Sequence, residues 1–112
     1  MKKIAKGSVK DATDYQEWFM GHFMPEDSPM HSKDIEIKWG TAKAGWTRNP
    51  WAPAIERHSI SILITGECAT VFEDEEAVLK KPGDYVLWYN VPHSFRAITD
   101  CTVLTIRWPS TK

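Results

Sequence analysis

The amino-acid sequence predicts an all-β fold, a barrel or a sandwich, within a single domain. Short segments rich in branched and aromatic residues recur at fairly regular intervals from residue 34 to residue 108, separated by glycine, proline or acidic residues. Almost no segment repeats its apolar residues with the period of an amphipathic helix. The chain has 112 residues, of which 42% are apolar, enough for one modest core.

The N-terminal third is the least regular part of the chain. Its first dozen residues are polar and are expected to be frayed or weakly docked. Thr13 and Gln16 have the spacing of a capping box, so a short helix is predicted to begin here. Residues 18–24 fit either that helix or a strand, because the apolar run is too short for its period to decide. Residues 25–32 are predicted to form a loop.

The first regular strand is predicted at residues 34–39, where two isoleucines and Trp39 alternate with Glu36 and Lys38. This alternation is typical of a half-buried strand, which a glycine then ends. A long irregular connection follows at residues 45–53, with two prolines and two tryptophans, and long loops in compact domains often carry function. Further strands are predicted at residues 58–65, 68–72, 77–79, 84–89, 95–98 and 101–108.

Charge and cysteine content argue against several classes of protein. The formal net charge is −1, with acidic and basic residues interspersed, so no nucleic-acid surface is expected. No segment approaches the roughly 20 apolar residues that span a bilayer, and the N-terminal lysines lack the apolar stretch of a signal peptide. Cys68 and Cys101 are too few for a disulfide framework. We therefore expect a cytoplasmic protein with reduced thiols and no membrane association.

The segment from Ile60 to Pro109 resembles the core of the cupin family. Its first strand ends in Gly-Glu, an acidic hairpin follows, and then come Pro-Gly-Asp, an apolar strand, Val-Pro-His and a closing strand. The resemblance covers about half of the chain, and it is to the short single-domain cupins of bacteria in particular. It implies a double-stranded β-helix, the cupin jelly-roll barrel, usually dimeric and with its site inside one open end. The expected organisation is an N-terminal extension at residues 1–33 and a barrel at residues 34–112.

The chain departs from the family pattern where the metal would bind. Metal-binding cupins carry a first motif with two histidines and a glutamate, and a second motif with one more histidine. Counted back from Gly66, the glutamate position falls on Ser59, and none of the first motif's ligands is present. In the second motif His93 matches the histidine, although it follows Gly83 one residue early. A stable divalent site needs roughly three or four protein ligands, so the resemblance implies no standard metal site.

A rebuilt metal site is the alternative. His58 stands beside Ser59 and forms, with His93, a candidate pair for Fe, Mn, Ni or Zn. Side chains alternate along a strand, so His58 reaches the interior only if a bulge near Arg57 rotates it inward.

The family register implies that Ser59, Ser61 and Leu63 face inward, whereas His58 and the isoleucines at positions 60, 62 and 64 face outward. Hydrophobicity alone would bury the isoleucines instead. Both hold if a second subunit or the N-terminal segment covers the isoleucine face, because an uncovered apolar stripe favours aggregation. We therefore predict a homodimer.

His93 is the leading site residue, because a neutral imidazole can donate and accept a hydrogen bond at once. It fits a polar contact to a ligand, a metal ligand, or a structural group bonded to the backbone. Phe95, two residues later, is expected to share its face. Arg107 fits either an anionic ligand or a surface ion pair. The other candidates for an aromatic and serine-lined pocket are Ser59, Ser61, Trp39, Trp46, Trp51 and Trp88.

These other candidates have alternatives too. The tryptophans at positions 39 and 88 fit core packing, and the serines fit a face open to solvent. The tryptophans at positions 46 and 51 stand in the long connection, where they fit either a lid over the barrel mouth or simple packing.

Three functions remain open. The first is the binding of a small organic molecule around His93 without metal, by a sensor, a carrier or an enzyme that uses His93 as acid and base. The second is a metal-dependent dioxygenase or isomerase with a rebuilt site at His93 and His58. The third is a non-catalytic dimeric module that acts on a protein partner. A nucleophile elbow and a glycine-rich phosphate loop are both absent from the sequence.

Overall fold

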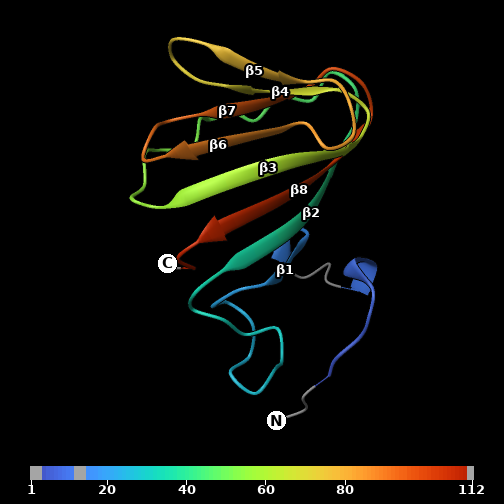
Figure 1. The fold of residues 1–112 in the computed structure, drawn as a ribbon, viewed down its shortest axis with the longest axis vertical. Helices are drawn as coiled ribbons and strands as arrows, with labels where there is room; N and C mark the ends of the chain where they lie inside the picture. Colours follow the sequence, from blue (N-terminus) through green and yellow to red (C-terminus); the bar gives the residue numbers. More distant parts are fainter. Residues whose placement is uncertain (1–3, 12–14, 111–112) are drawn as a thin grey trace.

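The computed structural model describes residues 4–11 and 15–110. They form two antiparallel sheets in face-to-face layers (Figure 1). The larger sheet has the strand order β1-β2-β8-β3-β6 and the smaller has the order β5-β4-β7. This arrangement confirms the predicted all-β double-stranded β-helix. The elements are a 3₁₀ turn, η1 (Val9–Asp11), and the strands β1 (Trp18–Met20), β2 (Glu36–Ala42), β3 (His58–Thr65), β4 (Cys68–Val71), β5 (Glu76–Leu79), β6 (Tyr85–Tyr89), β7 (Ser94–Ala97) and β8 (Cys101–Trp108).

The strand predictions hold closely from β3 onward. The segments predicted at residues 58–65 and 101–108 coincide with β3 and β8, and those for the shorter strands β4 to β7 differ only by a residue at their ends. The strand β2 begins later than predicted and runs on to Ala42. These strands were predictable because each combines branched residues with a flanking turn residue.

The N-terminal part differs more from the prediction. Tyr15 has 3₁₀ conformation, but Gln16 and Glu17 have φ angles of +53° and +75°, which a right-handed helix does not permit, so the predicted helix does not continue through these two residues. Thr13 lies outside the described residues. The strand alternative holds over β1, where Trp18 lies opposite Lys38 of β2 and extends the larger sheet. The division into an extension and a barrel at residue 33 stays a prediction. No helix in the described ranges is long and apolar enough to cross a bilayer.

The hydrophobic core closes one end of the barrel. It lies beside the turns from β3 to β4 and from β7 to β8, and its buried members are Leu63, Cys68, Leu79, Ala97, Cys101 and Val103. The first of these turns needs glycine at position 66, where φ is +82° and a side chain would collide with the carbonyl oxygen of Asp100. Away from this end, the interior is lined by polar and aromatic side chains.

The register of the larger sheet divides its side chains into an inner and an outer face. One inner row joins Glu36, Arg107, Ser59 and Trp88, and the next joins Lys38, Thr105, Ser61 and Val86. The outer rows between them carry apolar side chains, namely Ile37, Ile106, Ile60 and Leu87, and then Trp39, Leu104, Ile62 and Tyr85. The interior of this sheet is therefore more polar than its outer surface.

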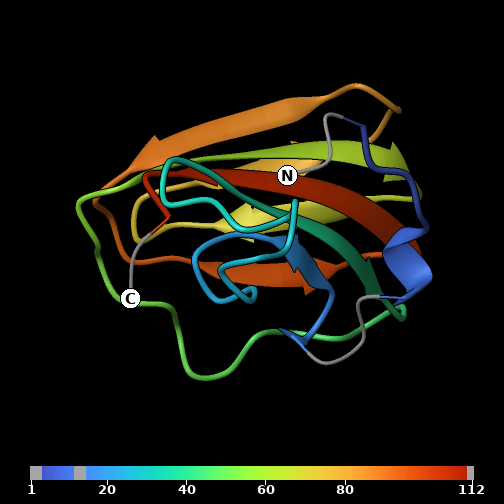
Figure 2. The same ribbon diagram turned by 90° about the horizontal axis from the view of Figure 1, so that it is seen from below.

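The long connection between β2 and β3 runs beside the free edge of β7 (Figure 2). Main-chain hydrogen bonds fix it there: Arg48 N donates to Phe95 O at 2.9 Å, Ala97 N to Trp46 O at 2.9 Å, and Ala52 N to His93 O at 2.7 Å. The segment thus protects an edge that would otherwise leave backbone groups unpaired.

Candidate functional site

A cavity of about 1220 Å³ opens between the two sheets. Ligand pockets commonly measure roughly 300–1,000 Å³, so a small organic molecule fits here together with water. Six of the candidate residues line the cavity: Ser61, Trp46, Trp88, His93, Phe95 and Arg107. The ion pair of Arg107 is with the buried Glu36, so the predicted surface ion pair is wrong. The other lining residues include Trp18, Lys38, Arg48, Thr70 and Thr105.

His93 immediately precedes β7 and lies against Trp88, with 4.8 Å between the ring centroids. Its backbone pairs with Ala52, which fixes the position of the ring's attachment point. Burial lowers the pKa of His93; the Val91 carbonyl opposes this shift, and the positive charge of Arg48 adds to it. The imidazole is therefore neutral at neutral pH. Its Nδ1 lies 3.4 Å from the carbonyl oxygen of Val91 and donates to it, as the backbone-bonded alternative predicted, so Nε2 is the nitrogen left to accept a hydrogen bond from a ligand.

Ser59 and Ser61 both face inward, as the register predicted. Ser59 is 4% exposed and Ser61 is 7% exposed, so a serine face open to solvent is wrong. The hydroxyl groups of Ser61 and Thr105 lie 2.8 Å apart, and both residues line the cavity. Ser59 lies in the neighbouring inner row, two residues before Ser61, and is not on the cavity wall.

Of the four tryptophan candidates, two line the cavity and two do not. Trp88 and Trp46 line the cavity, and the Trp46 ring lies 6.0 Å from the ring of Phe95. Trp39 does not, because it alternates with Lys38 and belongs to the outer face of β2. Trp51 lies in the same connection as Trp46, and both are exposed, but Trp51 is not on the cavity wall.

The predicted metal pair is not brought together. His58 is exposed on the outer face, where its ring stacks on Trp108 at 5.4 Å and lies 4.6 Å from the ring of Tyr89. No inward bulge turns His58, since its register with Tyr89 and Trp108 is regular. Within residues 4–11 and 15–110, no three side chains of His, Cys, Asp or Glu are placed to hold a metal ion. The residues around His93 therefore do not fit a three-ligand site.

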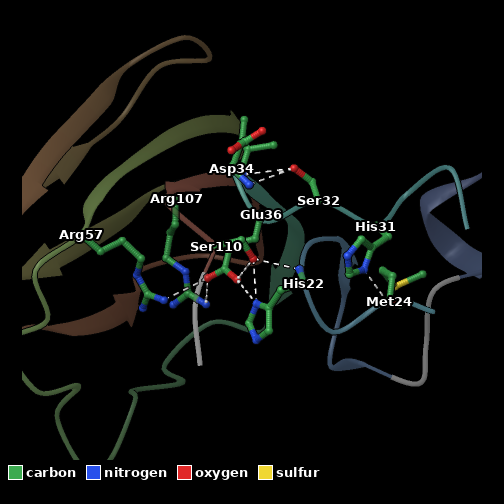
Figure 3. A network of polar contacts seen from close by, with 10 residues as sticks. His22, Met24, His31, Ser32, Asp34, Glu36, Arg57, Arg107 and Ser110 are labelled. Carbon is green, nitrogen blue, oxygen red and sulfur yellow. Dashed lines mark hydrogen bonds and ion pairs between the residues drawn. The ribbon is translucent and has the colours of Figure 1, made fainter. Parts of the chain in front are cut away.

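The buried carboxylate of Glu36 lies on the inner face of the larger sheet, at the end away from the hydrophobic core, and binds several side chains (Figure 3). Glu36 is 1% exposed; its Oε1 accepts a hydrogen bond from Arg57 at 3.1 Å and forms an ion pair with Arg107 at 2.6 Å. Its Oε2 accepts the hydroxyl of Ser110 at 2.8 Å, and Nδ1 of His22 lies 2.8 Å from that hydroxyl oxygen. Residues from both ends of the chain thus meet at one carboxylate.

Lys38 and Glu36 correct the interpretation of the first strand. The alternation placed them on the polar face of a half-buried strand, yet that face is the interior. Glu36 is buried because two guanidinium groups neutralise it. Burial lowers the pKa of Arg107 to about 10, although Glu36 favours its charged form, so it stays charged at neutral pH. Its guanidinium carbon lies 3.9 Å from the ring centroid of Trp18.

Comparison with known proteins gives a clear relative among solved structures. No family model matches the sequence, and no curated protein matches it either. The structure of an RmlC-like cupin protein from Desulfovibrio desulfuricans is 31% identical in sequence and superposes with a TM-score of 0.58. The match covers 70% of this chain and 74% of that one. The chain is a cupin.

Two more distant structures share only the fold with this cupin. KdgF from a Halomonas species is 19% identical, with a TM-score of 0.64, over 73% of this chain and 74% of that chain. The DMSP lyase DddQ from Ruegeria pomeroyi is 22% identical, with a TM-score of 0.61, over 77% of this chain and 43% of that chain.

The cupin resemblance located His93 and the inward serines, but it did not locate the charged wall. Lys38 and Arg48 were missed as site residues. A signal for Lys38 was present: in β3 the polar residues face inward and the isoleucines outward, and the same rule applied to β2 places Lys38 inside. Arg48 had no such signal, because an irregular connection has no period.

Proposed function

We propose that this cupin binds a small organic molecule in the cavity around His93, without the family's standard metal site. The observation that carries the proposal is the neutral imidazole of His93 on the wall of a large cavity, against the ring of Trp88. Aromatic rings offer contact area, and the hydroxyl groups of Ser61 and Thr105 offer directional hydrogen bonds. His93 supplies the principal polar contact, and in an enzyme it would be the acid–base group.

A screen with a matched variant tests this proposal. Purified protein and His93→Ala are compared by thermal shift against a fixed panel of hydroxy acids, amino acids, sugars and aromatic acids. We expect at least one compound to raise the unfolding temperature of the natural protein and not that of His93→Ala. The unliganded variant is expected to unfold at nearly the natural temperature. If His93→Ala fails to fold, His93 is structural and the site assignment is wrong.

Elemental analysis of protein purified without affinity-tag metal tests the rival metalloenzyme. Near one metal per chain, lost in His93→Ala, would replace the proposed function by a metal-dependent one. The likeness to the DMSP lyase supports neither alternative, because at 22% identity it concerns the fold only.

We further propose that the cupin is a homodimer formed through the outer face of its larger sheet. Rows of apolar side chains cross β2, β8, β3 and β6 there without any acidic residue, lysine or arginine. Tyr85 is 67% exposed and Leu87 is 53% exposed, and such patches seldom stay uncovered on a monomer. A second copy fits this face because two uncharged surfaces meet without burying an unpaired charge.

Light scattering after size exclusion tests the dimer. We expect a mass of two chains for the natural protein and one chain for Leu87→Glu. Val78→Glu is the matched control, because Val78 is 40% exposed on the smaller sheet. A monomeric natural protein, or dissociation by Val78→Glu alone, would contradict the proposed interface. The cytoplasmic location also stays a proposal, for which fractionation of the native host is the test.

A further inference from the structure

Cations outnumber carboxylates on the wall of the cavity. Lys38, Arg48 and Arg107 line it, together with Lys43 at its rim. Of the two carboxylates on the wall, Asp100 pairs with Lys43 at 3.7 Å. The other carboxylate belongs to Glu17 and accepts hydrogen bonds from the backbone and hydroxyl of Thr41.

The carboxylate of Glu36, which lies behind this wall, is already shared by two guanidinium groups. Glu36 binds Arg57 and Arg107 at once, so this cluster carries an excess positive charge of its own. Neither Lys38 nor Arg48 has a carboxylate within 4.0 Å in the part of the chain that the structure describes. Positive charge therefore accumulates at the cavity beyond what the nearby described carboxylates neutralise.

Lys38 carries part of this charge in a partly buried position. Its ammonium lies 5.7 Å from the ring centroid of Trp18, in a partly buried position on the inner face of β2. Burial lowers the pKa of Lys38; Glu17 opposes this shift, whereas Arg107 and Arg48 add to it by repulsion. Titratable groups perturbed in this way cluster at functional sites. Arg48, the other cation of the wall with no carboxylate nearby among the described residues, is exposed and therefore open to a ligand.

We propose that the cavity takes the carboxylate of a small organic acid, with Lys38 and Arg48 binding the carboxylate and the aromatic wall packing on the rest of the molecule. This inference rests on the proposed function and names its ligand class. The guanidinium of Arg48 can hold a carboxylate with two parallel hydrogen bonds, and Lys38 adds a point charge. His93, whose Nδ1 donates to the Val91 carbonyl, then offers Nε2 as an acceptor to the uncharged part of the acid.

An organic carboxylate fits this wall better than a phosphate. Phosphate groups are commonly cradled by successive backbone N–H groups of a glycine-rich loop or a helix N-terminus. The three-residue η1 does not line the cavity, and the described residues that do line it include a single glycine, Gly40 of β2. The rings of Trp46, Trp88 and Phe95 offer apolar contact that inorganic phosphate cannot use.

Benzoate and its neutral isostere benzamide are the probes. Nitrogen-labelled protein is titrated with each at constant ionic strength, and the indole N–H signals report binding, with that of Trp88 identified by Trp88→Phe. We expect benzoate to bind at least about tenfold more tightly than benzamide, since a charged hydrogen bond contributes that much. Lys38→Met and Arg48→Gln should each weaken the binding of benzoate by about tenfold and leave the affinity for benzamide unchanged.

Three controls complete the experiment. Lys81→Gln removes an exposed lysine that is not on the cavity wall, and it should change neither affinity. Lys38→Met should change the unfolding temperature little, because it removes both the repulsion from the arginines and the contact with the Trp18 ring. A large fall in the unfolding temperature would mean that Lys38 serves the fold, and it would overturn the inference. Inorganic phosphate at equal ionic strength should not displace benzoate, and tighter phosphate binding would overturn it as well.

The failure of this inference is distinguishable from that of the proposed function. Equal affinity for benzoate and benzamide, both lost in His93→Ala, would overturn the carboxylate assignment and leave the site at His93 in place. Binding of neither probe at the cavity would also overturn the carboxylate assignment, while the compound panel decides on the proposed function. If His93→Ala binds benzoate as tightly as the natural protein, and Lys38→Met binds it more weakly, the carboxylate site is supported and the role of His93 is contradicted.

Discussion

Replacing Glu36 by glutamine removes the negative charge from the centre of a buried network. The amide retains a group that Ser110 can bond, but it leaves the guanidinium groups of Arg57 and Arg107 close together without a counter-charge. Their side chains are 11% and 25% exposed, so water replaces the lost partner only in part. Breaking a buried ion pair in this way costs about 3–5 kcal/mol.

We expect Glu36→Gln to lose free energy of unfolding at the lower end of this range, since Arg107 keeps some access to water. Loss of about 3 kcal/mol corresponds to a fall of roughly 13 °C in Tm for a chain of this length. Glu36→Gln is measured by urea unfolding and by calorimetry, with the hairpin-tip variant Glu73→Gln as the exposed control. The control is expected to change stability by less than about 0.5 kcal/mol. Adding Arg57→Met to Glu36→Gln should restore part of the loss, because it removes one unpaired charge.

A small effect would refute this reasoning. If Glu36→Gln costs less than about 1 kcal/mol, the carboxylate is not the shared partner of two arginines in solution, and the network does not hold the chain ends together.

Three further results follow from burial. The lowered pKa of His93 means that, as pH falls, the unfolded chain takes up a proton before the native protein does. The contribution of His93 to stability is therefore complete above pH 6.5 and is lost as pH falls below that value. The difference in urea midpoint between the natural protein and His93→Gln should show this dependence. Burial raises the pKa of Cys68 to about 12 and also raises that of Cys101, so folded protein should resist iodoacetamide at about pH 8, and rapid labelling would mean that the core opens. Leu63 is fully buried, and Leu63→Ala should lower the free energy of unfolding by about 3 kcal/mol; a loss below about 1 kcal/mol would place Leu63 outside the core.

The strands from β3 onward were predictable because their signals are local. Alternation, branched residues and flanking glycine or proline lie within a few positions of each other, and neighbouring strands then pair in register. The cupin resemblance added the direction of the side chains in β3, which hydrophobicity alone gave the wrong way round. It therefore predicted that Ser61 faces the interior and that His93 belongs to the site, and both residues line the cavity.

The charged interior was not predictable in the same way. Glu36 is buried because Arg57, Arg107 and Ser110 reach it from distant parts of the chain, and no local pattern reports such a meeting. The failure at Trp39 has the same origin: the period of a strand says which residues share a face, but not which face is the interior. Both errors concern long-range packing rather than the choice of secondary structure.

The connection beside β7 has a consequence for how this barrel can change over evolutionary time. Trp46 and Arg48 reach the cavity from a segment that is attached to β7 by its main chain. Main-chain hydrogen bonds form with nearly any side chain, proline excepted, so substitutions at these two positions leave the attachment intact. The residues proposed to contact a ligand can therefore change independently of the residues that fold the barrel, so the same scaffold could come to bind other ligands without first losing its stability.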